Sequence, residues 1–187
     1  MTDHDKKRLL QLARESITAQ LQGKSLPNWP LLQEEPVGYG GAFVTLRNVR
    51  NGHRLRGCIG QFHPTELLGS IVQSMAVAAL DDPRFRSVPV KLSELSDLRI
   101  EISILSPMER TNDPLSLVPG VHGIFICRDG QSGCFLPQVA VEQQWDQHEL
   151  LSYCCTEKAG LDPEAWRDPQ TEVYLFEAII FSEEDDD

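Results

Sequence analysis

The hexapeptide LRGCIG, residues 55–60, places one cysteine between two glycines, with an arginine two residues before it. A thiolate is the reactive form of cysteine, and a nearby arginine or a helix N-terminus favours it. The spacing raises the hypothesis of a nucleophilic or redox thiol at Cys58, with Arg56 on the same strand face lowering the thiol pKa or holding an anion. Gly57 and Gly60 would let a ligand approach closely, so they join Arg56 as binding candidates. The alternative is that the glycines serve a tight strand-to-helix turn and Cys58 only fills space.

His122 is a second residue that could take part in proton transfer, and it lies in the segment PGVHGIF. Glycines before and after it predict an unusual backbone conformation around the histidine. Imidazole is also the most frequent general base in proteins. A catalytic pair would need His122 within a side chain or two of Cys58. A histidine held by hydrogen bonds in the turn before a strand is the alternative that the pattern leaves open.

Three other polar residues are candidates for binding. Glu101 lies in the middle of the apolar segment IEISIL, and Gln138 and Glu142 come directly after the segment GCFLP, where a strand is expected to end. A solvated or ion-paired strand face would explain Glu101 without any function.

The histidines do not form a metal-binding pattern, since none of the five belongs to an H-x-H or H-x-x-x-H pair. Cys58 and His63 are five residues apart, but two ligands do not make a zinc site, so we predict no metal centre. The chain has neither a phosphate-binding P-loop nor the glycine fingerprint of dinucleotide-binding proteins, and it identifies no cofactor.

The charge of the chain argues against two classes of partner. With 17 basic and 28 acidic residues, the formal net charge is −11, which disfavours nucleic acid and anionic membrane surfaces. The segment MTDHDKKRLLQLARES has no apolar core of the signal-peptide kind, and no apolar stretch approaches the roughly 20 residues of a membrane span. We therefore predict a cytoplasmic protein without nucleic-acid or membrane partners.

Cysteine usage and the acidic end of the chain fit the same class. The five cysteines are odd in number and include no C-x-x-C pair, so they are predicted to be free thiols. The chain closes with SEEDDD, and residues 182–187 are predicted to form a disordered acidic tail.

Hydrophobic periodicity predicts a first helix over residues 3–23, followed by a connector rich in proline and glycine. The segment GAFVTLRNVRNGHRLRGCIG predicts a hairpin that turns at Asn51-Gly52, and its return strand carries the hexapeptide. A long, largely apolar helix is predicted to start at Pro64, with Glu66 in its first turn, and the segment DPRF ends it.

The second half of the chain contains mostly strand patterns. LRIEISILSPMER is the clearest strand, a second hairpin is expected around RDGQSG, and one or two helices then end at Gly160. TEVYLFEAIIFSEE is expected to be one last strand. Neighbouring strands without crossover helices favour antiparallel pairing. The predicted class is therefore α+β, an antiparallel sheet flanked by helices, with a smaller second lobe.

Several segments together resemble a known family. LRGCIG, DPRF, IEISILSP, GVHGIFI, GCFLPQVAVEQQWD and CCTEKAGL occur in the same order as in the AMMECR family, whose bacterial and archaeal members are also called AmmeMemoRadiSam system protein A. The resemblance implies a single AMMECR-like domain over residues 1–181, with room for two lobes. It also implies that residues 55–60 line a functional cleft.

The resemblance implies partners but no reaction. The family name marks an association with a Memo-like protein, which resembles extradiol dioxygenases, and with a radical S-adenosylmethionine enzyme. This chain has no C-x-x-x-C-x-x-C cluster motif, so it is not itself the radical enzyme.

Three hypotheses stay open. The first is an enzyme, or the substrate-holding subunit of one, that acts with these partners on a small molecule or a protein through Cys58 and His122. The second is a non-catalytic binding or adaptor module whose hexapeptide grips a ligand or partner. In the third, the hexapeptide only folds the turn.

Overall fold

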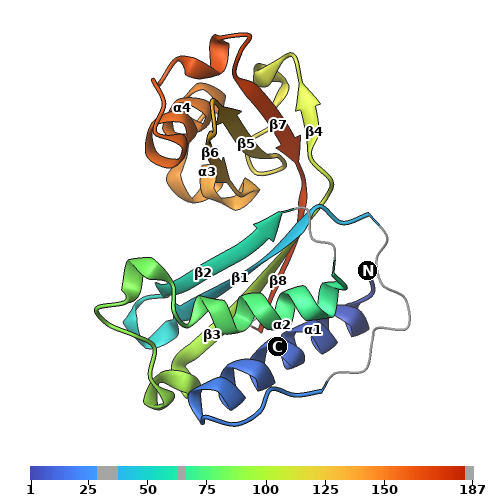
Figure 1. The fold of residues 1–187 in the computed structure, drawn as a ribbon, viewed down its shortest axis with the longest axis vertical. Coiled ribbons are helices and arrows are strands. Elements are labelled where there is room, and N and C mark those ends of the chain that lie inside the picture. Colours follow the sequence, from blue (N-terminus) through green and yellow to red (C-terminus); the bar gives the residue numbers. More distant parts are fainter. Residues whose placement is uncertain (29–37, 63–65, 184–187) are drawn as a thin grey trace. The chain divides into compact units, whose positions relative to one another are not determined.

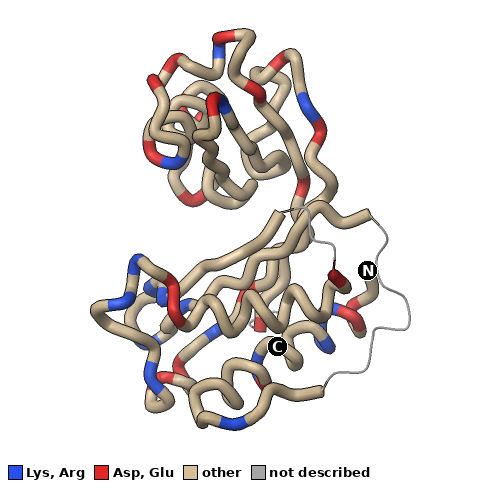
Figure 2. Tube along the Cα trace, in the orientation of Figure 1, with Lys and Arg blue, Asp and Glu red and all other residues tan. Residues whose placement is uncertain are grey.

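The structure is a computed structural model that describes residues 1–28, 38–62 and 66–183. Residues 184–187 of the expected acidic tail lie outside that part of the chain, as do His63 and Pro64. Within it, no helix combines the length and the apolar character that crossing a membrane requires. Acidic positions are spread along both halves of the described chain (Figure 2).

The chain divides into two compact units. Unit 1 comprises Met1–Ile104 and Ile179–Asp187, and unit 2 comprises Leu105–Ala178. Each unit has one four-stranded antiparallel sheet and its own helices (Figure 1), so the predicted α+β class is confirmed. The strands are divided between two sheets, whereas the sequence pattern predicted one sheet.

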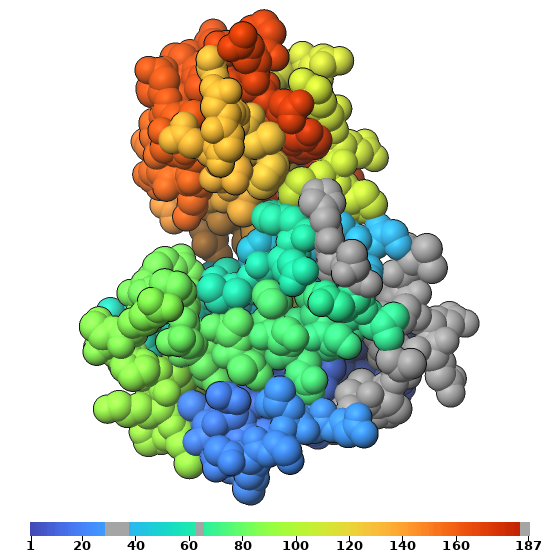
Figure 3. All heavy atoms as spheres, in the orientation of Figure 1, coloured from blue at the N-terminus to red at the C-terminus, as the bar shows by residue number. Residues whose placement is uncertain are grey.

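Unit 1 is a layer of two helices on a sheet with the strand order β2-β1-β3-β8. Its elements are α1 (Asp3–Leu21), β1 (Gly41–Asn48), β2 (Arg54–Phe62), α2 (Leu68–Ala79), β3 (Leu98–Leu105) and β8 (Ala178–Ser182). α1 and α2 lie side by side over one face of this sheet (Figures 1 and 3). Both helices and the strands contribute to one apolar core, which includes Leu9, Val44, Ile71 and Ile102.

Helix α1 forms because its first turn is capped and its apolar residues recur at helical spacing. The Asp5 N–H donates to the Thr2 hydroxyl at 3.2 Å, and the Thr2 N–H donates to the Asp5 carboxylate at 3.0 Å. Leu9 and Ile17 are fully buried on the inner face of the helix. The predicted helix is confirmed, with its end at Leu21 instead of residue 23.

The hairpin of β1 and β2 is also confirmed, but a bulge interrupts its ladder. Leu46 pairs with Gly57, whereas Arg47 pairs with Leu55, so Arg56 has no residue opposite it. The strict alternation that placed Arg56 and Cys58 on one polar face therefore does not hold across this point.

The hexapeptide lies on the return strand of the hairpin, as predicted. Because β2 continues to Phe62, the alternative of a strand-to-helix turn at its glycines is wrong. The predicted start of the next helix is also wrong. The helix begins at Leu68, and Leu67 before it is still extended, so Glu66 precedes the helix. Pairing with β1 explains the difference, because it holds the chain extended as far as the Gly41–Phe62 pair.

The predicted last strand is in fact two strands in different sheets. β7 (Glu172–Phe176) belongs to unit 2, β8 belongs to unit 1, and Glu177 separates them. Both halves are rich in strand-forming residues, so the pattern VYLFEAIIF reads as continuous. The predicted strand LRIEISILSPMER also divides, because β3 ends at Leu105 and residues 109–111 form β4 in the other sheet.

Unit 2 is built on a sheet with the strand order β4-β7-β5-β6. Its other elements are β4 (Glu109–Thr111), β5 (Gly123–Arg128), β6 (Gln131–Phe135), α3 (Pro137–Gln143) and α4 (Gln147–Tyr153). α4 continues as a π-helical segment, Cys154–Ala159, which ends at the predicted Gly160 with φ 69°. Ile124, Leu150 and Trp166 are among the residues of its core. All five cysteines of the chain are free thiols, as predicted.

Candidate functional site

The two glycines of the hexapeptide are explained by packing on opposite faces of β2. A Cβ on Gly57 would lie 1.9 Å from the carbonyl oxygen of Ala79 at the end of α2. A Cβ on Gly60 would lie 2.1 Å from the ring of Phe43, which is the residue opposite it on β1. No larger residue fits at either position without moving its neighbours.

Cys58 lies on the face of β2 that points away from the helices, directly opposite Thr45. The Thr45 hydroxyl donates a hydrogen bond to Cys58 Sγ at 3.3 Å. β2 is an edge strand, and the main chain of Cys58 forms hydrogen bonds with side chains beyond that edge. Its N–H donates to Asp82 Oδ2 at 2.9 Å, and the Arg84 guanidinium donates to its carbonyl oxygen at 3.3 Å.

Asp82 and Arg84 belong to the segment DPRF, which was interpreted from sequence only as the end of a helix. The two side chains form an ion pair of 2.6 Å, and the Asp82 side chain is only 1% exposed. Together they supply the hydrogen-bond partners that an edge strand otherwise lacks. An Asp-x-Arg step directly after a helix is the signal that could have indicated this role.

The electrostatics favour a neutral thiol. Burial raises the pKa of Cys58, while the hydrogen bond from Thr45 and the charge of Arg84 oppose that rise without cancelling it. The negative charges of Asp82 and Glu101 raise the pKa further. The predicted activation of Cys58 by a helix N-terminus has no structural basis, because α2 begins ten residues further on, at Leu68.

Arg56 is committed to a different set of partners. Its guanidinium donates to both carboxylate oxygens of Glu94, at 2.9 and 3.1 Å, and to the carbonyl oxygen of Val88 at 2.9 Å. The side chain is only 10% exposed. Arg56 therefore fastens the segment 88–94 to β2, and the cation that acts on Cys58 is Arg84.

The other predicted site residues are divided between the units. Glu101, on β3, joins Cys58 in unit 1, where it contributes to the raised pKa of the thiol. His122, Gln138 and Glu142 all belong to unit 2. Neither unit by itself brings the predicted catalytic pair together.

His122 lies directly before β5 and lines a cavity of about 440 Å³ with Glu109, Leu175 and Phe176. The Val118 N–H donates to His122 Nδ1 at 3.0 Å, so the neutral ring carries its proton on Nε2. Gln138 and Glu142 lie on α3 and do not line this cavity. Among the residues that the structure describes, no three His, Cys, Asp or Glu side chains are grouped so that they could hold a metal ion.

Comparison with known proteins gives consistent matches over nearly the whole chain. A family model described as AMMECR1 matches residues 10–181. Protein NEQ441 of Nanoarchaeum equitans is 39% identical over 183 residues, covering 94% of this chain and 99% of that protein. Protein MK0488 of Methanopyrus kandleri is 40% identical over 185 residues, covering 95% and 87% of the two chains.

A solved structure has the same fold. The crystal structure of the uncharacterized protein PH0010 from Pyrococcus horikoshii superposes with a TM-score of 0.88 at 37% sequence identity. The match covers 98% of this chain and 94% of that one.

Proposed function

The chain belongs to the AMMECR1 family, and from that premise we propose that it is a non-catalytic binding module of the AmmeMemoRadiSam type. It acts with a Memo-like protein and a radical S-adenosylmethionine enzyme. In this role the partners perform the chemistry, and this chain holds a small molecule or a protein for them. The candidate binding surface is the outer face of β2 around the half-buried Cys58, with the buried Thr45 opposite it on β1 and Glu101 on β3.

The observation that carries the proposal is the state of Cys58. A nucleophilic cysteine needs a lowered pKa, and here burial raises the pKa of the thiol. Arg84, the cation beside it, is already paired with Asp82, and Arg56 is paired with Glu94. A neutral thiol beside a threonine hydroxyl can contact a ligand but is poorly suited to attack one.

The first test measures the reactivity of the thiol. The intact protein is treated with iodoacetamide between pH 6 and pH 10, and alkylation of the Cys58 peptide is followed by mass spectrometry. We expect a rate that inflects above pH 9.0, because the pKa of Cys58 is raised from that value. Cys127 is the internal control, since its pKa is raised as well and its peptide is measured in the same digest. An inflection near pH 7 for Cys58 alone would refute the proposal and indicate an activated nucleophile.

The second test measures association. The chain is titrated with the purified Memo-like protein and radical enzyme of its own source organism, separately and together. We expect Cys58→Ser to bind within about twofold of the wild type, because the exchange is nearly isosteric and keeps a hydrogen-bonding group. The reaction of the reconstituted mixture should also survive this exchange. If the chain binds neither protein, the proposed partnership is refuted. If Cys58→Ser keeps binding but loses turnover, Cys58 has a chemical role.

A further inference from the structure

Unit 1 carries a basic surface that the proposed function leaves unassigned. Two segments of this unit, residues 47–56 and 83–91, contain seven of the protein's 17 basic residues and no acidic residue. The protein as a whole has a formal net charge of −11. Figure 2 shows Lys and Arg positions close to one another at this end of unit 1, in the β1–β2 hairpin and in the loop after α2. A surface whose charge is opposite to that of the whole protein favours partners of one charge, here anionic ones.

Two hydrogen bonds hold residues 84–88 along the outer edge of β2, which is the edge strand of its sheet. Arg84 donates to the carbonyl oxygen of Cys58 at 3.3 Å, and Arg56 donates to the carbonyl oxygen of Val88 at 2.9 Å. The segment therefore runs beside the strand in the opposite direction. The two basic segments are thus neighbours in space, although 26 and 32 positions of sequence separate the bonded residues.

The exposed cations of both segments share this surface. Arg86 lies between the two hydrogen-bonded points, and Arg54 lies two residues before Arg56 on β2. The Lys91 N–H donates to the Glu94 carboxylate at 3.2 Å, and the same carboxylate binds the Arg56 guanidinium. Four exposed cations therefore follow the edge of β2, and together they are named the basic strip: Arg54, Arg84, Arg86 and Lys91.

Three cations of the basic strip are not neutralised by the protein. Within the part of the chain that the structure describes, no carboxylate forms an ion pair with Arg54, Arg86 or Lys91. Asp81 is exposed beside the strip and offsets one of these three charges. An excess of positive charge therefore remains.

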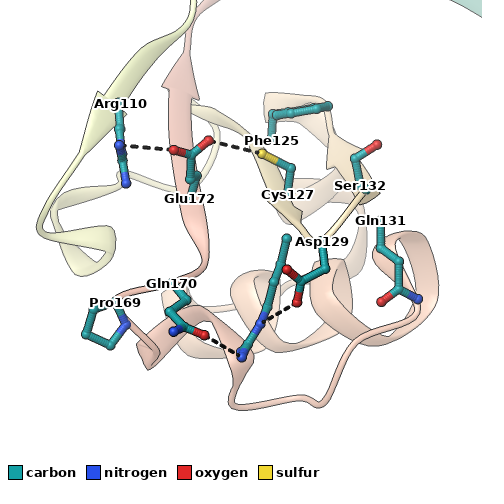
Figure 4. A pocket seen from close by; sticks show the side chains of 11 residues that line it. Arg110, Phe125, Cys127, Asp129, Gln131, Ser132, Pro169, Gln170 and Glu172 are labelled. Atoms are coloured by element: carbon teal, nitrogen blue, oxygen red, sulfur yellow. Dashed lines mark hydrogen bonds and ion pairs between the residues drawn. The ribbon is translucent and has the colours of Figure 1, made fainter.

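Two arginines of unit 2 differ in this respect. Arg110 and Arg128 line a cavity of about 570 Å³ (Figure 4), and each of them is paired with a carboxylate. Glu172 binds Arg110 at 3.0 Å, and Asp168 binds Arg128 at 2.9 Å. The positive charges of this cavity are compensated, whereas those of the basic strip are not.

We propose that the basic strip docks an extended acidic segment of a partner protein. From Arg54 to Cys58 the edge of β2 spans about 13 Å, because a strand rises about 3.3 Å per residue. Alternate side chains of an extended peptide lie about 6.7 Å apart on one side, so carboxylates on every second residue reach the whole strip. Arginine suits such a row, because its planar guanidinium can bind a carboxylate through two parallel hydrogen bonds.

Charge also decides between a protein segment and a nucleic acid. A nucleic acid carries its negative charge far beyond the strip, where a chain of net charge −11 repels it. A short acidic segment contacts the strip alone. This docking role rests on the proposed function, from which the need for a protein partner follows, and it gives the binding module a docking surface beside Cys58.

The experiment measures binding of a peptide of six glutamates, labelled with a neutral fluorophore, to the full chain by fluorescence anisotropy. We expect a Kd of about 1 mM or tighter in 20 mM salt, and a Kd at least about fivefold weaker in 200 mM salt because exposed charges are screened. The matched peptide of six glutamines should bind at least about tenfold more weakly than the glutamate peptide. A single-stranded DNA of twelve nucleotides is the competing probe. Equal binding of the two peptides, or tighter binding of the DNA than of the glutamate peptide, would overturn the proposal.

Two variants with the same net charge test the position of the cations. The first removes the unpaired charges of the strip by combining Arg54→Gln, Arg86→Gln and Lys91→Gln. The matched control removes three exposed charges outside the strip by combining Lys24→Gln, Lys158→Gln and Arg167→Gln. We expect the glutamate peptide to bind at least about tenfold more weakly to the first variant and within about threefold of the wild type to the control. Equal weakening in both variants would show that only net charge matters and would refute the basic strip. If the first variant does not fold, amide shifts of residues 84–92 in the wild-type chain, titrated with the same peptide, decide whether it binds there.

The partner proteins separate the docking role of the strip from the proposed function. We expect the strip variant to bind the Memo-like protein or the radical enzyme at least about tenfold more weakly than the wild type does. If the strip variant binds both proteins as well as the wild type, the strip is not the docking surface and the proposed function stands. If the wild type binds neither protein, the proposed function is refuted, and the peptide measurements still decide whether the strip takes an acidic segment.

Discussion

Gly57→Ala should destabilise unit 1 strongly, because the added methyl group has no space. Its carbon would lie 1.9 Å from the carbonyl oxygen and 2.9 Å from the carbonyl carbon of Ala79. An ordinary carbon–oxygen contact is about 3.3 Å, so β2 and α2 would have to separate by roughly 1.4 Å. Both obstructing atoms belong to the main chain and cannot rotate away. We therefore expect a loss of about 3 kcal/mol in the free energy of unfolding, the upper end of the usual range for overpacking.

Gly69→Ala is the matched control, because it makes the same exchange in the same unit. The new methyl group would lie 3.7 Å from Leu12 Cδ2, an ordinary contact, and Gly69 is inside helix α2. Alanine is about 1 kcal/mol better than glycine in a helix, so this variant should equal or exceed the wild type. Urea unfolding followed by circular dichroism at 222 nm measures both variants, with an unchanged m-value as the sign of a native-like fold. A Gly57→Ala variant within 0.5 kcal/mol of the wild type would refute the packing explanation of this glycine.

Two further predictions concern the charged groups that hold β2. Burial alone would raise the pKa of Asp82, but hydrogen bonds from the Arg84 side chain and from backbone N–H groups outweigh burial and lower the pKa to about 2 from its ordinary 3.8. A lowered pKa contributes stability above the unfolded value that is lost as the pH falls toward the folded value. Asp82→Asn should therefore cost about 2 kcal/mol at pH 7 in urea unfolding, and the difference should shrink between pH 4 and pH 2; a constant difference would contradict this linkage. Arg56→Lys should cost about 2 kcal/mol, because lysine cannot bind Glu94 through two parallel hydrogen bonds, whereas Arg50→Lys at a 78% exposed ion pair should cost less than 0.5 kcal/mol. Equal costs in these two lysine variants would show that the buried pair has no special role.

Local sequence patterns predicted the helices, strands and turns whose signals lie within the element itself. The capped first helix, the two hairpins, β3 and the helix stop at Gly160 all follow from spacing and turn residues within about twenty positions of one another. The division into two sheets could not be predicted in this way. It depends on which partner each half of residues 172–182 finds, and those partners are β5 in unit 2 and β3 in unit 1.

The candidate site shows the same limit at the level of side chains. The polar neighbours of Cys58 come from residues 13 positions before it and 24 to 26 positions after it, namely Thr45, Asp82 and Arg84. The nearest arginine in sequence, Arg56, is directed elsewhere by a one-residue bulge. A strand period of two makes any inference about faces fail when a single residue is inserted.

Each sequence feature that made Cys58 resemble a reactive residue has a structural explanation that does not involve the thiol. The flanking glycines are required by Ala79 and by Phe43, and neither leaves open space for a ligand at its own Cα. Arg56 serves Glu94, and Arg84 approaches the carbonyl oxygen of Cys58 while Asp82 neutralises its charge. Activation of a thiol requires an uncompensated positive potential at the sulfur. Here the Cys58 sulfur is buried, which raises its pKa, and it accepts one hydrogen bond, from the neutral Thr45 hydroxyl. If the hexapeptide has a role in binding, that role therefore depends on the shape and polarity of the strand surface around Cys58 and not on the nucleophilicity of its thiol.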